Sequence, residues 1–380
     1  MFKVDLVSRH DYLNFIAKHP YRNFYQYPSW ADLKTEWKWT YDYIGWFSSS
    51  DVLVGCALIL YRKVPGINKH LAYIPRGPLI DWFGQIPIHQ WFDPLFQYLK
   101  TKQVFSLKMD PPLTRQKWSS KNIASGRQEF QSYGLSNKRI TDISSDVIYN
   151  GVEYIGQELD KMGWRKWMTQ ESFDTVQPTF VYRLNMKGKS LNQLFVDFDP
   201  LVQDQIRKAD DEGIQISEGD ESELVHFHDL LRSTAKREQS EVRTLQYFNT
   251  MFQSLKMEDV SRIRLYFAKK QDQYLSAALT VRVDGHFWEL YSACTSYEAH
   301  EPGSYLMRWK MIQDAYALGD RTYDFQGVHN QIDEEHAADP ILQYKLGFGG
   351  EVHELMGEWD FPVMPMLHWA FDMYMKKGKK

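Results

Sequence analysis

Two stretches of the chain repeat one order of elements, and this repeat constrains the fold more than any other feature. Each copy has a helix-like segment, three strand-like segments, a second helix-like segment and a final strand. In the first copy the strand-like segments are residues 41–46, 55–60, 72–73 and 105–110. In the second copy they are residues 263–268, 276–281, 287–291 and 321–325. The repeat is much longer than the roughly 20–50-residue period of a solenoid, so we expect two α/β units facing each other across a cleft.

Length and composition agree with two units. The chain has 380 residues, more than one hydrophobic core usually organises, and 43% of them are apolar. No stretch approaches the about 18 apolar residues of a membrane-spanning helix, and the first residues lack the apolar core of a signal peptide. We therefore expect a cytoplasmic protein. Cys56 and Cys294 lie in strand-like contexts and are expected to be buried thiols.

Local signals predict helices before each set of strands and at the end of the chain. One helix is expected at residues 29–37, with Ser29 as its cap after Pro28, and its counterpart at residues 245–252. Another short helix is expected at residues 366–375. This last helix is predicted to return to the first domain.

The connection between the copies is long and mixed. Residues 118–122 and 144–146 are expected to be loops, and residues 153–162 a helix. A domain boundary is expected near residues 174–178. The predicted domains are residues 1–176, completed by residues 357–380, and residues 177–356.

Polar residues at strand ends are the first candidates for chemistry, because α/β folds bind ligands there. Asp110 and Asp324 follow or end the last strand of the two copies. A carboxylate in this place is able to act as a general base, and an aspartate in a turn or before proline also serves as a local cap. The spacing alone leaves both interpretations open.

Several ordered motifs resemble the Fem family, the aminoacyl-tRNA-dependent transferases that build peptidoglycan interpeptide bridges. Each motif is short, but together they run in order through nearly the whole chain. In the first half they are Trp30-x-x-x-Lys34, Tyr73-x-x-x-Gly77-Pro78 and a strand ending in Asp110-Pro111. In the second half they are the Ile206-x-x-Ala209 helix, Arg243 with Tyr247, the segment Tyr323–Gly327, and Tyr344-Lys345-x-x-Phe348.

The resemblance implies an α/β fold with mixed sheets, made of two tandem GNAT-like acyltransferase domains with a cleft. Some family members carry a coiled-coil arm, but residues 210–243 have no heptad run long enough to form one. The chain thus resembles the compact branch of the family. The implied function is an aminoacyltransferase of peptidoglycan biosynthesis, in cell wall biogenesis and the maintenance of cell shape.

The implied reaction is attack by a stem-peptide amine on the aminoacyl ester of a charged tRNA. Such a site must stabilise the oxyanion of the tetrahedral intermediate, and family analogy gives this role to Lys345. Asp110 is predicted to orient or deprotonate the amine. No cofactor is expected beyond aminoacyl-tRNA as co-substrate.

The resemblance also implies residues that bind the precursor, either UDP-MurNAc-pentapeptide or lipid II. Lys34 and Arg243 supply charge for phosphates, while Tyr247 and Tyr291 supply hydroxyls and ring faces. The other predicted substrate-binding residues are Tyr73 and Tyr344. Two departures, Phe105 and Glu289, stand where a relative has tyrosine, so the acceptor contacts cannot all be transferred.

Aminoacyl-tRNA and a membrane surface are the two predicted macromolecular partners. The net charge of −4 argues against general nucleic-acid binding but allows one basic groove. Arg207 and Lys208 are the predicted tRNA-binding residues, and further basic residues are expected to converge with them in the second domain. These are Lys161, Arg165, Lys166, Lys187 and Lys189. The apolar, lysine-rich tail is able to touch an anionic inner membrane surface or to pack on the first domain.

Other chemistries have weaker signals. His226 and His228 are two residues apart, which on a helix sends them to different faces, so no metal is expected. A GNAT acyl-CoA transferase shares the predicted fold, but the sequence near Pro78 and Gly303 lacks the glycine-rich pyrophosphate loop. A non-catalytic homologue that binds the precursor remains an alternative. The donor, with alanine, serine and glycine all plausible, also stays open.

Overall fold

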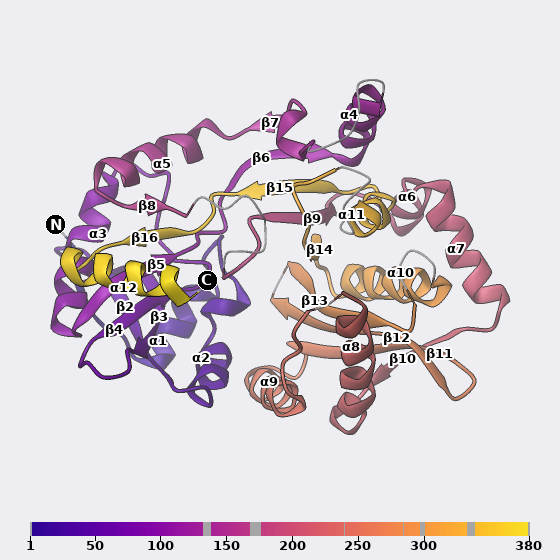
Figure 1. Ribbon diagram of the computed structural model, residues 1–380, viewed down its shortest axis with the longest axis horizontal. Helices are drawn as coiled ribbons and strands as arrows, with labels where there is room; N and C mark the ends of the chain where they lie inside the picture. The colour runs from indigo at the N-terminus through magenta and orange to yellow at the C-terminus, as the bar shows by residue number, and fades with distance from the viewer. Residues whose placement is uncertain are drawn as a thin grey trace.

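The protein, described here as a computed structural model, consists of two α/β units side by side (Figure 1). The structure describes residues 2–131, 138–167, 176–238, 240–283, 285–296, 301–332 and 339–378. The first unit is built on a seven-stranded sheet and the second on a nine-stranded sheet. One core cluster contains buried residues of both units, so the two units share apolar packing where they meet.

The first sheet has the strand order β1-β2-β3-β4-β5-β16-β8. Its strands are β1 (Lys3–Leu6), β2 (Trp39–Phe47), β3 (Leu53–Lys63), β4 (His70–Ile74), β5 (Val104–Met109), β8 (Arg165–Lys166) and β16 (Trp359–Phe361). Its helices are α1 (Arg9–Ile16), α2 (Pro28–Thr35), α3 (Ile88–Thr101), α5 (Asn150–Lys161) and α12 (Pro365–Gly378). Helix α3 buries Trp91, Leu95 and Leu99, whose spacing of four places them on one face of the helix.

The second sheet has the strand order β10-β11-β12-β13-β14-β9-β15-β6-β7. Its strands are β6 (Thr114–Ser119), β7 (Val147–Ile148), β9 (Phe180–Asn185), β10 (Gln215–Gly219), β11 (Ile263–Lys270), β12 (Gln273–Val283), β13 (His286–Cys294), β14 (Thr322–Gly327) and β15 (Glu351–Leu355). Its helices are α4 (Ser120–Gln131), α6 (Leu191–Val196), α7 (Pro200–Asp211), α8 (Leu224–Glu238), α9 (Leu245–Glu258), α10 (Pro302–Ala317) and α11 (Asp339–Leu346). Residues 210–243, which lack a long heptad run, contain the end of α7, β10 and α8.

The strand pairing confirms the internal repeat. From β1 to β5 the sheet has three antiparallel pairs and then one parallel pair, and β10 to β14 has the same sequence of pairs. In each unit two helices precede the second strand, and one helix makes the crossover to the parallel strand. The parallel strands β5 and β14 are therefore equivalent.

Strands cross between the units, which differs from the expected extent of the first domain. β6 and β7 lie within residues 1–176 but join the second sheet, where β6 pairs with β15 over five residue pairs. β16 and α12 return to the first unit, as expected: β16 pairs with β5, and Phe371 of α12 packs on Phe105 with ring centroids 5.2 Å apart. The expected boundary near residues 174–178 lies partly outside the described residues.

Two local predictions are wrong. Helix α2 begins at Pro28, with Tyr27 as N-cap and no side-chain cap. Ser29 instead donates a hydrogen bond of 2.8 Å to Glu258 on α9 and so joins the two units. Residues 118–122, expected to form a loop, end β6 and begin α4, because the Trp118 side chain is buried and its indole donates to the Ile143 carbonyl.

Among the residues that the structure describes, no helix is both long and apolar enough to cross a membrane.

Candidate active site at the junction of the two units

Four of the predicted substrate-binding residues converge where the two units meet. Lys34 lies on α2 and Tyr247 on α9, and these helices pack against each other. The Lys34 ammonium is 3.4 Å from Tyr247 Oη and 4.3 Å from the centroid of the Trp30 ring. The Arg243 guanidinium is 5.6 Å from the Tyr247 ring, and the phenol of Tyr291 on β13 adds to burial in raising the Tyr247 pKa. We call Lys34, Arg243, Tyr247 and Tyr291 the junction cluster.

The junction cluster carries positive charge in a desolvated place. Burial, together with the charge of Arg243, lowers the pKa of Lys34 to about 8. No carboxylate in the described part of the chain forms an ion pair with either cation. Two uncompensated cations beside phenol hydroxyls favour an anionic ligand, such as the phosphates of a nucleotide or lipid precursor.

Asp110 follows β5 and is almost completely buried. Its Oδ1 accepts a hydrogen bond of 2.7 Å from the Arg76 backbone N–H, and its Oδ2 is 3.7 Å from Arg76 Nη1. Burial raises the Asp110 pKa to about 6, although the charge of Arg76 and the Tyr73 hydroxyl act in the opposite direction. The structure therefore brings Tyr73 and Asp110 together, and it gives the carboxyl a pKa suited to exchanging protons near neutral pH.

Tyr25 lies near both of these groups of residues, and no motif in the sequence predicts a role for it. It lies on a short 3-10 helix (Phe24–Gln26), and its ring is 4.7 Å from that of Trp30, edge to face. Burial, the Tyr291 phenol and the carboxylates of Asp110 and Asp324 all raise its pKa. Tyr25 is thus close enough to both the Asp110 carboxyl and Tyr291 of the junction cluster to interact electrostatically with each of them.

Lys345 lies on α11 and is 8% exposed. Its ammonium donates hydrogen bonds of 2.8 Å to the carbonyl oxygens of Phe325 and Gly327, at the end of β14. Because β14 is the counterpart of β5, Lys345 and Asp110 are found at equivalent strand ends of the two units. The carbonyls fix a cation in a low-dielectric place, where its attraction for a developing negative charge is strong.

Tyr344, the neighbour of Lys345, belongs to a buried polar network that the sequence did not reveal. Arg308 on α10 is fully buried and forms a two-point ion pair with Glu289 on β13. It also donates a hydrogen bond of 2.6 Å to Tyr344 Oη. The Tyr323 hydroxyl donates a hydrogen bond of 2.8 Å to the same glutamate. We call Arg308, Glu289 and Tyr344 the buried brace, because it ties α11 to α10 and β13. The Tyr344 hydroxyl is thus part of this network and not of the junction cluster, and its role in substrate binding stays a prediction.

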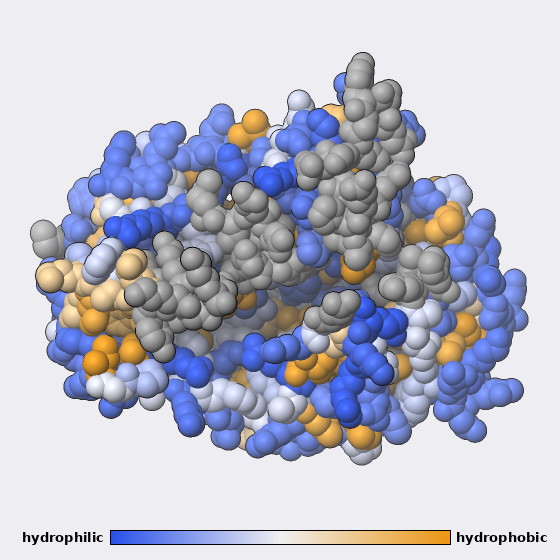
Figure 2. Space-filling model, in the orientation of Figure 1, coloured by the Kyte–Doolittle hydropathy of each residue, from blue (hydrophilic) through white to orange (hydrophobic). Residues whose placement is uncertain are grey.

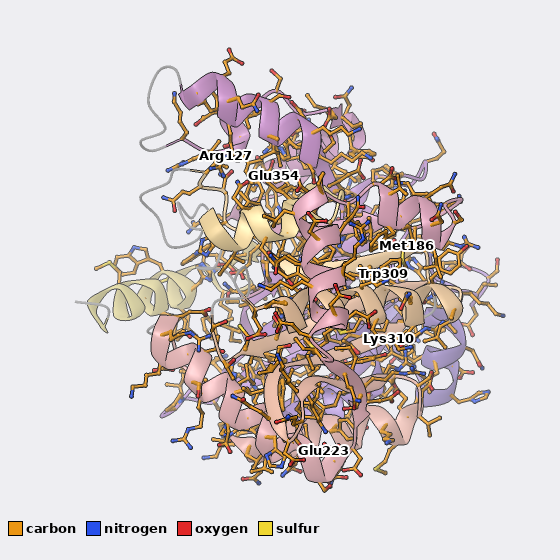
Figure 3. The ribbon with its side chains drawn as sticks, turned by 90° about the vertical axis from the view of Figure 1, so that its right-hand side faces the viewer. Arg127, Met186, Glu223, Trp309, Lys310 and Glu354 are labelled. Carbon is orange, nitrogen blue, oxygen red and sulfur yellow. The ribbon has the colours of Figure 1, made fainter. Side chains whose placement is uncertain are left out.

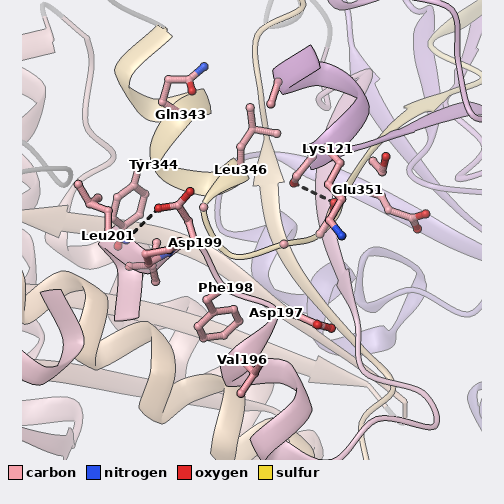
Figure 4. A pocket seen from close by; sticks show the side chains of 18 of the residues that line it. Lys121, Val196, Asp197, Phe198, Asp199, Leu201, Gln343, Tyr344, Leu346 and Glu351 are labelled. Carbon is pink, nitrogen blue, oxygen red and sulfur yellow. Dashed lines mark hydrogen bonds between the residues drawn. The ribbon is translucent and has the colours of Figure 1, made fainter. Parts of the chain in front are cut away.

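A cavity of about 1090 Å³ is lined by Gln343, Tyr344 and Leu346 of α11 (Figure 4). In Figure 4, Lys121 and Glu351 lie on one side of it and Leu201 and Tyr344 on the other. Gly349 lines it in a left-handed conformation with φ of +69°, and a Cβ there would lie 2.7 Å from the Asp197 carbonyl oxygen. The cavity takes lysines from segments that the sequence analysis did not combine. They are Lys117, Lys121 and Lys189.

The family model for the FemAB family matches residues 7–263 and 253–377. The chain belongs to the FemAB family. Among its relatives are lipid II:glycine glycyltransferases of two staphylococci. The protein of Staphylococcus saprophyticus is 21% identical over 421 residues, covering 93% of this chain and 91% of the relative. That of Staphylococcus aureus strain MSSA476 is 22% identical over 393 residues, covering 95% and 93%.

The crystal structure of FemX has the same fold. It superposes with a TM-score of 0.77 at 18% identity and covers 97% of this chain and 99% of FemX. Together with the strand order of the two sheets, this likeness confirms the expected pair of GNAT-like units. The resemblance to the Fem family is likewise confirmed.

Two sequence departures within this FemAB chain are explained by burial. Phe105 is fully buried under Phe371, and Glu289 is 4% exposed as part of the buried brace. Both residues pack inside a unit. Neither faces the junction cluster, so neither by itself changes the surface offered to a ligand there.

The predicted basic surface forms only in part. Lys161, Arg165 and Lys166 lie on α5 and β8 in the first unit, so they do not join the second domain as expected. Arg207 and Lys208 are on α7, where Arg207 pairs with Asp204 at 3.0 Å and lies over the Phe195 ring. The expected convergence is wrong for the first three residues because β8 pairs with β16 in the first sheet.

Proposed function

We propose that this protein transfers an amino acid from aminoacyl-tRNA to a side-chain amine in the stem peptide of a peptidoglycan precursor. No resident cofactor takes part in this proposal, because the aminoacyl ester is the activated co-substrate. The names of the staphylococcal relatives support lipid II as acceptor and make glycine the first donor to test. The reaction would take place at the cytoplasmic side of the membrane, where charged tRNA is present.

The observation that carries the proposal is the convergence of the junction cluster. Lys34 and Tyr247 are 213 positions apart in the sequence and come from different units, yet their polar atoms are 3.4 Å apart. Two cations that have no carboxylate partner among the described residues, together with two phenols, would form a site for the phosphates of a precursor. Tyr73 and Asp110, linked to this cluster through Tyr25, would then receive the stem peptide.

The transfer requires a neutral amine and a stabilised oxyanion. In the proposed step the amine nitrogen attacks the ester carbonyl carbon and passes a proton to Asp110. The C–O bond to the ribose then breaks, and the ribose oxygen leaves as a hydroxyl with the proton that Asp110 took from the amine, which regenerates the carboxylate. An Asp110 pKa of about 6 leaves the carboxylate mostly ionised at neutral pH and able to accept the proton.

Lys345 supplies the positive charge for the other half of the step. Its ammonium, held by the carbonyls of Phe325 and Gly327, would attract the oxyanion or the leaving ribose oxygen. The cavity beside α11 is the proposed place for the end of the tRNA, because Lys121 lines it next to the segment that carries Lys345. Lys117 and Lys189, which also line it, are paired with Glu351 and Asp197. Arg207 and Lys208 on α7 would contact phosphates farther along the RNA.

The test is transfer by the purified protein with radiolabelled Gly-, Ala- and Ser-tRNA, each offered lipid II or UDP-MurNAc-pentapeptide. The variant Lys345→Ala is compared with Lys310→Ala, a matched control on the surface of α10 (Figure 3), where Lys310 pairs with Asp314. We expect label in one precursor, lost in Lys345→Ala and retained in Lys310→Ala.

The outcome separates the proposal from its alternatives. No transfer from any tRNA to either precursor, together with consumption of acetyl-CoA in the presence of amines, would replace it by an acyl-CoA transferase. Precursor binding without any transfer would indicate a non-catalytic homologue. Transfer that Lys345→Ala leaves unchanged would refute the role of this lysine but keep the reaction.

A further inference from the structure

Helix α12 presents an apolar face to solvent. Met366 is 88% exposed, Trp369 64% and Met373 43%. Their spacing of three and four residues places them on one face of the helix, together with the exposed Pro365. Monomeric proteins rarely leave several large apolar side chains together in water without a partner.

The opposite face of α12 holds the helix on the first unit. His368 is 3% exposed, and the ring of Phe371 packs against that of Phe105 on β5. Just before the helix begins, the Met364 backbone N–H donates a hydrogen bond of 2.9 Å to the Phe105 carbonyl. One side of the helix is thus packed on the first unit. The exposed apolar residues are on the other side, so they are additional to the residues that hold the helix in place.

The position of α12 makes this face accessible. Figure 3 shows α12 protruding at the left from the rest of the ribbon. The left of Figure 3 is the side that faces the viewer in Figure 1. In Figure 2 a pale to orange surface lies at the left, where Figure 1 draws the first part of α12. A flat surface could therefore approach the helix without meeting the second unit first.

The charge that follows this face indicates what covers it. Lys376 and Lys377 come three and four residues after Met373, within the same helix, and the sequence ends with Lys379 and Lys380. The last two residues lie outside the described part of the chain. Methionine and tryptophan on one face with lysines in the next turn are the composition of a helix that lies in the interface of an anionic bilayer.

We propose that the outer face of α12 binds the surface of an anionic phospholipid membrane. Met366, Trp369 and Met373 insert at the level of the acyl-chain boundary, where an indole is stabilised, and the lysine-rich sequence that follows them makes an anionic surface favourable. In this arrangement α12 lies parallel to the membrane surface, and the protein is attached to the membrane through its first unit. This inference rests on α12 alone and does not depend on the proposed reaction, although it suits a lipid-linked acceptor.

The test is cosedimentation of the full-length protein with vesicles that contain no peptidoglycan precursor. We expect binding to vesicles of equal phosphatidylglycerol and phosphatidylcholine that is at least about 10-fold tighter than to phosphatidylcholine alone, and weaker in 0.5 M salt. The variant Met366→Glu/Trp369→Glu should lose at least about 10-fold in binding. The matched control Met257→Glu/Val260→Glu changes two residues that are 87% and 77% exposed at the end of α9, and it should bind as the unmodified protein does.

Three results would overturn the inference. The first is equal binding to both kinds of vesicle, and the second is undiminished binding by the α12 variant. The third is a dimer in sedimentation velocity that Met366→Glu/Trp369→Glu dissociates while no vesicle binding is seen, which would assign the face to a second copy of the chain. Unchanged thermal melting of both variants shows that the comparison concerns surfaces and not folding.

Discussion

Replacing Asp110 by asparagine should make the protein more stable at neutral pH while removing its proposed catalytic base. The Asp110 carboxyl is 2% exposed, and burial raises its pKa to about 6 from the ordinary value of 3.8. Asparagine has the shape of the neutral acid and can still accept the Arg76 backbone N–H. It cannot ionise, so it avoids the cost of a buried charge.

The magnitude follows from linkage between protonation and folding. Below about pH 3.8 the carboxyl is protonated in both the folded and the unfolded chain and contributes no difference. Between pH 3.8 and 6 the unfolded chain loses its proton first, so the free energy of unfolding falls as the pH rises. Above pH 6 the loss is complete and amounts to about 3 kcal/mol. The attraction to Arg76 is already contained in this figure, because it helps to set the pKa.

The assay is urea unfolding of the unmodified protein and of Asp110→Asn at several values between pH 4 and 8. The variant should gain stability relative to the unmodified protein as the pH rises, from almost nothing near pH 4 to about 3 kcal/mol at pH 7.5. Its transferase activity should fall at the same time. A stability difference that does not change with pH, or a variant that is less stable at pH 7.5, would refute the reasoning.

Three further predictions concern the other ionisable groups. Lys345→Ala should lower the turnover number by at least about 100-fold with little change in acceptor KM, and a loss below about 10-fold in single-turnover assays would contradict its oxyanion role. Because the Lys34 pKa is lowered to about 8, the acceptor KM should rise above that pH as the Lys34 amine loses its proton. In Lys34→Arg the acceptor KM should not change with pH. A KM that does not change with pH in the unmodified protein would exclude Lys34 from phosphate binding. Glu289→Gln should destabilise the fold by about 3 kcal/mol or more, because it leaves the buried Arg308 charge uncompensated. In a double-mutant cycle with Arg308→Met the two costs should not add, and additive costs in urea unfolding would contradict the coupling.

The repeat was predictable because its signals are local. Strands such as β3 and β12 are runs of apolar residues bounded by turns, and their order is the same in both halves of the sequence. The exchange of β6 was not predictable in this way. Only Trp118 of its six residues is buried, and its partner β15 lies more than 230 positions away, so no local pattern identifies the pairing.

The site was predictable only where the family resemblance extends. The convergence of Lys34 with Tyr247 joins two helices that no periodicity relates. Tyr25 and Arg308 were missed for opposite reasons. Tyr25 sits in a short irregular segment rich in aromatic residues, and Arg308 looks like a surface cation on a helix until the structure shows Glu289 beside it.

The interleaved strands affect how the chain reaches its folded state during synthesis. β15 lies between β9 and β6 in one sheet, and β16 lies between β5 and β8 in the other. Both of these interior positions, near one edge of each sheet, are filled by residues 351–361. Neither unit is therefore able to complete its sheet while the ribosome is still making the first 350 residues. We therefore expect the two sheets to be completed together, after residues 351–361 emerge, and not one domain at a time from the N-terminus.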